Sequence, residues 1–100
     1  MSNDKEQMQV EFHNRANEML FSIYHAFESS IANVSRRSAE FKFQQLKKQY
    51  ATTLEQELHA IARGILVRHK DERQLKELDP MFHHFIQEYL HRFIQKVNDL

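Results

Sequence analysis

The stretch DPMFHHFIQEYLHRFIQKV, residues 79–97, decides the fold. Asp79 is a residue type that caps helix N-termini, and Pro80 suits the first helical position, where its missing N–H group costs no hydrogen bond. The pattern predicts a helix that begins at Pro80. Its apolar residues recur at the i, i+3, i+4, i+7 spacing of a buried helical face: Phe82, Phe85, Ile86, Tyr89, Leu90, Phe93, Ile94 and Val97. At about 100° per residue this face covers roughly half of the circumference, so the helix should contact at least two others.

The composition of the whole chain favours helices throughout. One Gly and one Pro in 100 residues leave few turn-forming residues, and β-branched residues are too sparse for a sheet. The sequence therefore predicts an all-α single domain over residues 1–100, folded as an elongated three-helix up-down-up bundle. The helices are expected at about 4–33, 39–69 and 80–97. Residues 71–78 either form a further short helix or extend the second helix, and a break at 69–71 is the preferred interpretation.

Two apolar stripes define the inner faces of the first two helices. The first stripe comprises Phe12, Ala16, Met19, Leu20, Ile23, Tyr24, Phe27, Ile31 and Val34. The second comprises Phe43, Leu46, Tyr50, Leu54, Leu58, Ile61 and Ile65. The serine-rich segment between them predicts a turn at 33–38.

Four apolar residues lie off these stripes: Val10, Phe21, Phe41 and Leu66. Single exposed apolar residues are common on protein surfaces, which is the simpler interpretation. However, a third helix of roughly 18 residues spans about 27 Å and cannot cover helices of roughly 30 residues, which span about 45 Å. The uncovered groove and the four residues together predict a homodimer that completes a larger bundle. Replacing Phe41 by a charged residue should then lower the assembly state and preserve helicity.

Charge and motif content narrow the classes of function. The 14 basic and 14 acidic side chains cancel, so no bulk charge attracts nucleic acid or an anionic membrane. No segment approaches the roughly 20 apolar residues of a membrane span, and the absence of Cys fits the cytoplasm. The chain has no Gly-rich phosphate loop and no nucleophile-elbow serine. The expectation is a cytoplasmic adaptor, chaperone or regulator without catalytic activity or cofactor, whose partners are a second copy and another protein.

A basic strip on the second helix gives the first alternative function. If the helix begins early enough, Arg36 aligns with Lys47 and Arg37 with Lys48, because residues 11 apart lie on nearly the same helical face. Such a strip could contact phosphates of RNA or DNA in a nucleic-acid-binding helical dimer. A solvated helix face is the simpler interpretation.

Histidines give the second alternative, because the chain contains seven of them. His84, Glu88 and His91 follow an i, i+4, i+7 spacing that places three potential zinc ligands on one helical face. That face points away from the apolar stripe, so solvated side chains are the simpler interpretation. His83 is expected at the edge of the core, as a satisfied boundary histidine or a pH-sensitive contact.

Overall fold

The chain folds into three long helices. The computed structural model describes residues 3–32, 39–68 and 72–99. Helix α1 spans Asn3–Ala32, α2 spans Ala39–Val67 and α3 spans Glu72–Asn98, and no strand occurs in these ranges. The prediction of an all-α protein with three packed helices is confirmed. The turn expected at 33–38 and the break expected at 69–71 lie outside the described residues.

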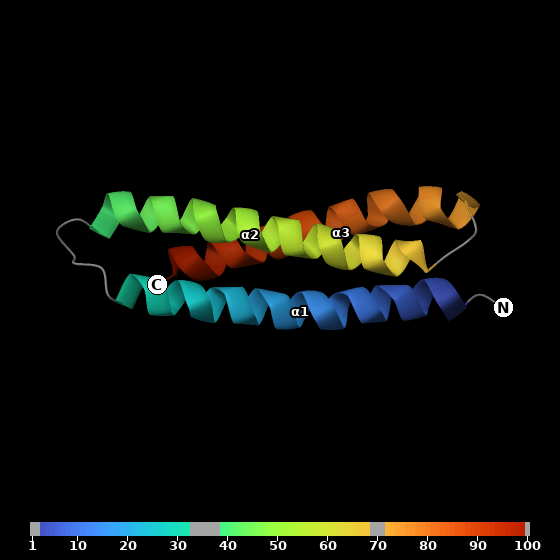
Figure 1. Cartoon of the computed structure of the whole chain (residues 1–100), viewed down its shortest axis with the longest axis horizontal. Helices are drawn as coiled ribbons and strands as arrows, with labels where there is room; N and C mark the ends of the chain where they lie inside the picture. The colour runs from blue at the N-terminus through green and yellow to red at the C-terminus, as the bar shows by residue number, and fades with distance from the viewer. Residues whose placement is uncertain (1–2, 33–38, 69–71, 100) are drawn as a thin grey trace.

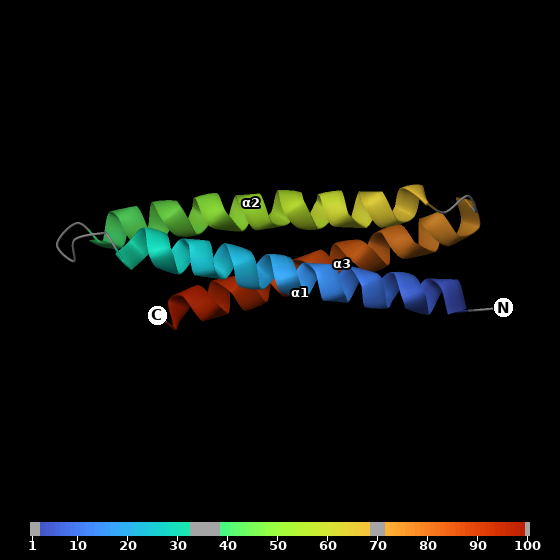
Figure 2. The same cartoon turned by 60° about the horizontal axis from the view of Figure 1, so that its bottom comes forward.

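The helices run antiparallel to their sequence neighbours and form an elongated bundle. Figures 1 and 2 show α1 and α3 running in one direction and α2 in the other. The bundle extends 57 × 18 × 18 Å, and its radius of gyration is 16.1 Å. A compact globule of this length would have a radius of gyration of about 13 Å. The predicted elongation follows from helix length, because a 30-residue helix cannot fit inside such a globule.

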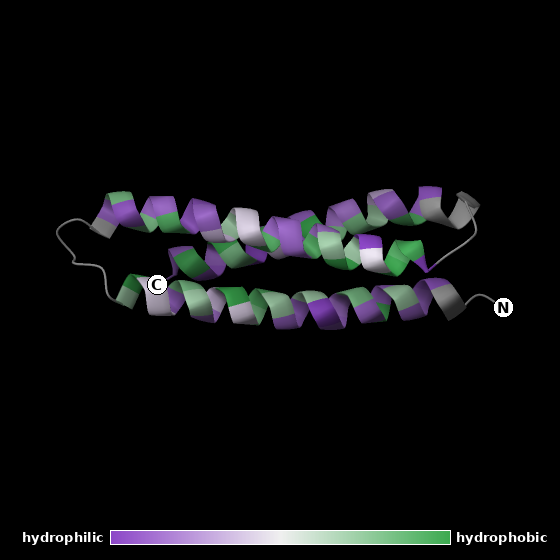
Figure 3. Ribbon diagram, in the orientation of Figure 1, coloured by the Kyte–Doolittle hydropathy of each residue, from purple (hydrophilic) through white to green (hydrophobic). Residues whose placement is uncertain are grey.

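One continuous apolar core runs along the bundle, and each helix turns its hydrophobic residues toward it (Figure 3). Near one end the ring of Phe12 packs against Phe82, with 5.0 Å between their centroids. Toward the other end Phe27 contacts the rings of Phe43 and Phe93 from the other two helices. The largest fully buried side chains in the described part of the chain are Phe12, Phe27, Leu54, Leu58, Ile65, Leu78, Phe82, Ile86, Tyr89, Phe93 and Val97.

The start of the third helix differs from the prediction. Helix α3 begins at Glu72 and contains Pro80, so residues 71–78 and 80–97 do not form separate helices (Figure 1). The reason is burial of Leu78, which lies two residues before Pro80 and has no exposed surface. Pro80 is exposed, so the hydrogen bond that it cannot donate is missing on the solvent side. Apolar burial on the inner side outweighs the local signal for a helix start.

The length of α3 removes one argument for a dimer. With 27 residues it nearly matches the 30 residues of α1 and the 29 of α2, so the long uncovered groove predicted from a short helix does not exist. A smaller gap remains, because Lys47 of α2 lies beside Asn98 near the end of α3, with 2.8 Å between Nζ and Oδ1. Residues 39–46 of α2 therefore extend past the last described turn of α3.

Candidate functional site

Four large apolar side chains are exposed on the described part of the bundle: Val10 (58%), Phe21 (67%), Phe41 (79%) and Val67 (81%). Three of these were expected from the sequence. Val67 was missed, although its position two residues after Ile65 of the inner stripe already turns it away from the core.

Leu66 is placed differently from the sequence expectation. It is half-buried and packs against the core, whereas a free outer position was expected. Leu66 lies seven residues after His59, on the same side of α2, and the ring of His59 contacts that of His83 on α3, 5.3 Å away. The flank of α2 that carries Leu66 therefore faces α3, and Leu66 is not part of the exposed apolar surface.

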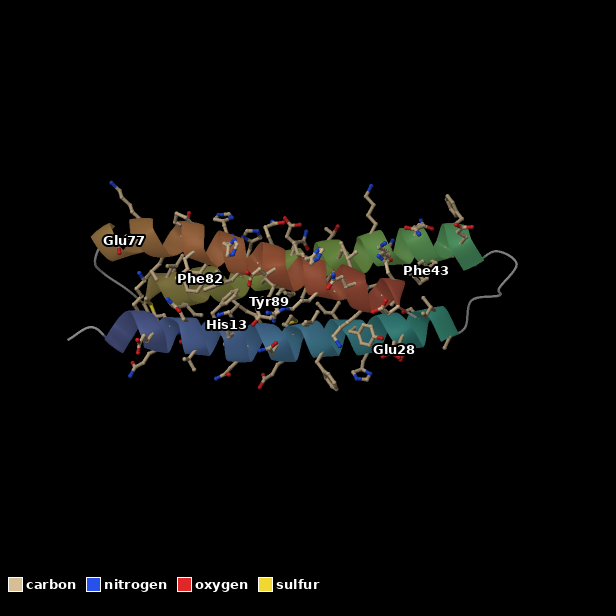
Figure 4. All side chains as sticks on the ribbon, turned by 180° about the vertical axis from the view of Figure 1, so that it is seen from behind. His13, Glu28, Phe43, Glu77, Phe82 and Tyr89 are labelled. Atoms are coloured by element: carbon tan, nitrogen blue, oxygen red, sulfur yellow. The ribbon has the colours of Figure 1, made fainter. Side chains whose placement is uncertain are left out.

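The outer face of α1 combines two of the exposed residues. Val10 and Phe21 are separated by 11 residues and so lie nearly in line along the helix. The ring of Phe21 packs against the ring of His25, one helical turn further along α1, with centroids 4.2 Å apart. A hollow of about 480 Å³ surrounds Val10, lined by Glu6, Gln7, Val10, Glu11, Asn14 and Arg15. Figure 4 shows that a row of side chains on α1 points away from the other two helices.

A second hollow, of about 680 Å³, lies between α2 and α3. Ala51, Leu90 and Ile94 are its half-buried apolar residues, and Lys47 and Lys48 lie at its edge. These two lysines belong to the predicted basic strip, whose other members, Arg36 and Arg37, lie outside the described residues. Lys47 donates a hydrogen bond to Asn98, which leaves Lys48 as the exposed cation of the described pair.

Comparison with models of known protein families, with curated proteins and with solved structures gives no match. In the helices that the structure describes, none is both long and apolar enough to cross a bilayer.

The three predicted metal ligands do not form a site. His84 Nε2 lies 3.0 Å from Glu88 Oε1, and both side chains are largely exposed. His91 lies instead along the hollow between α2 and α3. No group of three or more His, Asp or Glu side chains with metal-binding geometry occurs within 3–32, 39–68 and 72–99. His83 is exposed and lies 3.8 Å from Asp79, so it is not the boundary residue expected.

A polar contact between α1 and α3 was not foreseen from the sequence. His13 Nδ1 lies 2.7 Å from the Tyr89 hydroxyl group, and the two rings pack among the core phenylalanines (Figure 4). Burial raises the pKa of Tyr89 above its ordinary value of 10.0, and the nearby Arg92 opposes this rise. To predict this pair from the sequence, the apolar stripes of α1 and α3 would have to be aligned with each other, because neither stripe alone shows which residues lie opposite.

Replacement of Tyr89 by phenylalanine tests this contact. At pH 7 we expect the free energy of unfolding to fall by about 0.5–1.5 kcal/mol, because the hydrogen bond to His13 is lost. Above about pH 10 the folded chain holds the Tyr89 proton more tightly than the unfolded chain does, so the wild type should lose stability as pH rises. The variant should lose less, as measured by urea denaturation at pH 7 and at several values above pH 10. The free energy of unfolding of the variant should still fall somewhat as pH rises, because burial also raises the pKa of Tyr24. If the free energy of unfolding fell equally with pH in both proteins, the raised pKa of Tyr89 would be contradicted.

Proposed function

We propose that this chain is an interaction protein, a non-catalytic helical bundle that works as an adaptor, chaperone or regulator in the cytoplasm and self-associates as a homodimer. The observation that carries the proposal is the exposure of three large apolar side chains, Val10, Phe21 and Phe41, on a bundle whose core is already filled by its own helices. Exposed aromatic residues are enriched at protein interfaces, since they bury a large apolar area when a partner covers them.

Charge also supports self-association. The formal net charge of the chain is zero at pH 7 with neutral histidines, so two copies carry no bulk repulsion.

The test is the absolute molar mass in solution, measured by light scattering over a wide range of protein concentration at pH 7. We expect the molar mass to rise with protein concentration and to reach twice the 12.1 kDa chain mass at the higher concentrations. A particle of single-chain mass at every concentration would contradict the homodimer, and the exposed residues would then belong to a different protein partner.

A further inference from the structure

We infer that two copies pair through the outer faces of α1, antiparallel and around a two-fold axis, so that Phe21 of each copy enters the hollow beside Val10 of the other. The inference rests on the proposed self-association and specifies its surface. The midpoint between Val10 and Phe21 lies between residues 15 and 16, so the axis passes beside this point, close to the middle of a helix that runs from Asn3 to Ala32.

The outer face of α1 has the spacing of a helix–helix seam. Val10, Asn14, Asn17 and Phe21 are separated by four, three and four residues, which is the alternation of the a and d positions in a coiled coil. At about 100° per residue they fall within a sector of roughly 60°. All four are exposed, and they lie opposite the buried stripe that begins with Phe12 and Ala16. Helix α1 therefore carries one seam for its own bundle and a second one without a partner in the bundle.

The second seam is self-complementary when it is turned end to end. In this register the numbers of two facing residues add up to 31. Val10 therefore faces Phe21 of the other copy, and Asn14 faces Asn17. Apolar residues then face apolar residues, and amides face amides. Asn14 and Asn17 are both exposed, so amide groups of both copies lie near the axis. A polar residue at such a position favours one register over others.

Shape supports the same register. The position opposite Phe21 is the hollow of about 480 Å³ around Val10. One wall of this hollow is held in place, because Glu11 accepts a hydrogen bond from Arg68 of α2, with 2.6 Å between Oε2 and Nη2. The two-fold axis repeats this arrangement, so the pairing creates two equivalent contacts between a phenyl ring and a hollow.

Charges on one flank of the seam are complementary. Glu6 comes within about one residue rise, or about 1.5 Å along the axis, of Tyr24 of the other copy. The Lys96 ammonium group lies 5.2 Å from the centroid of that Tyr24 ring, so Glu6 faces a cation.

The start of α2 offers a shorter alternative. Phe41 lies one helical turn before Gln45, the first of the residues that line a hollow of about 750 Å³, and Gln49 also lines this hollow. A two-fold pairing of Phe41 with Gln49 overlaps only residues 39–51 of the two helices. That overlap is about 20 Å long, whereas the α1 register overlaps residues 3–28 over about 39 Å. The longer overlap removes more surface from water, which favours α1.

Matched aspartate variants at the two exposed phenylalanines test the inference. We expect Phe21→Asp to raise the dissociation constant of the dimer by about 10- to 100-fold, because the phenyl ring that packs against Val10 is lost and the new carboxylate would face Glu6 and Glu11 of the other copy. Phe41→Asp should leave the constant unchanged, because Phe41 lies on α2, outside the α1 seam. This replaces the expectation from the sequence that a charge at Phe41 lowers the assembly state. Sedimentation equilibrium gives the constants, and circular dichroism should show wild-type helicity for both variants.

Cross-linking tests the antiparallel direction without removing either phenylalanine. The chain has no cysteine, so cysteines can be introduced singly at the exposed positions Gln7 and His25, whose numbers sum to 32. A short thiol-reactive cross-linker should join Gln7→Cys chains to His25→Cys chains in a mixture. Neither variant should cross-link to itself, because each cysteine lies more than about 25 Å from its own copy in this register.

The outcomes separate this inference from the proposed function. A wild-type monomer at all concentrations would overturn both. A wild-type dimer that Phe21→Asp leaves intact, or that Phe41→Asp also dissociates, would overturn the α1 seam and keep the homodimer. Cross-linking of either cysteine variant to itself would overturn the antiparallel register, even if an aspartate variant failed to fold.

Discussion

Replacement of Phe12 by alanine is expected to lower the free energy of unfolding by about 3–5 kcal/mol, the range for truncating a buried phenylalanine. Phe12 has no exposed surface. Its ring centroid lies 5.0 Å from that of Phe82 and 6.0 Å from those of Phe85 and Tyr89. Alanine would leave a cavity in the middle of this aromatic cluster, and a rigid helix backbone cannot collapse fully to fill it. Urea denaturation followed by far-UV circular dichroism measures the change.

Phe41→Ala is the matched control for this prediction. It removes the same atoms from a side chain that is 79% exposed, so the free energy of unfolding should change by no more than about 0.5 kcal/mol. Both variants and the wild type should be compared at one protein concentration, since association would stabilise the folded chain. Equal losses for Phe12→Ala and Phe41→Ala would mean that the aromatic cluster around Phe12 does not form the core.

The inner faces of α1 and α2 were predictable because burial imposes the helical period on the sequence. Phe12, Ala16 and Phe27 of the first predicted stripe are buried, as are Leu54 and Leu58 of the second. These positions need only a partner surface somewhere on their side of the helix. The pattern therefore identifies them without knowledge of which helix provides that surface.

The outer residues were harder to predict because exposure depends on the neighbouring helix. Phe41 and Leu66 lie off the same stripe, at similar angles around α2, yet Phe41 is exposed and Leu66 packs against the core. The difference is that α3 covers the part of α2 that carries Leu66 and stops before the part that carries Phe41. A single-helix pattern contains no information about where another helix ends. The contact between His13 and Tyr89 was missed because a pattern within one helix does not show which residue of another helix lies opposite.

The helix start at Pro80 was predicted from local chemistry, which a longer-range contribution overrode. Asp79 followed by Pro80 is a good start signal when nothing precedes it. In the bundle, Leu78 belongs to the buried core, and it lies in the helical turn before Pro80. Burying a leucine side chain contributes about 1.5–3 kcal/mol, which is comparable to the cost of about 3 kcal/mol for proline inside a helix.

Replacement of Pro80 by alanine should therefore raise the free energy of unfolding by about 1–3 kcal/mol. Alanine restores the N–H group that can donate to the carbonyl group of Lys76, and it removes the clash of the proline ring with that carbonyl group. Pro80 is exposed, so little packing is lost. Urea denaturation of the variant and the wild type at the same concentration measures the difference.

Asp79→Ala distinguishes the continuous helix from a helix that begins at Pro80. In a continuous helix Asp79 is an exposed interior residue whose nearest partner is His83, 3.8 Å away, so its replacement should change stability by no more than about 0.5 kcal/mol. As an N-cap, Asp79 would contribute about 1 kcal/mol, and its loss would be measurable. Stabilisation by Pro80→Ala together with a neutral Asp79→Ala is the result expected for one unbroken α3. A destabilising Asp79→Ala with a neutral Pro80→Ala would instead place a helix start at Pro80, and the turn that carries Leu78 would then be a separate segment.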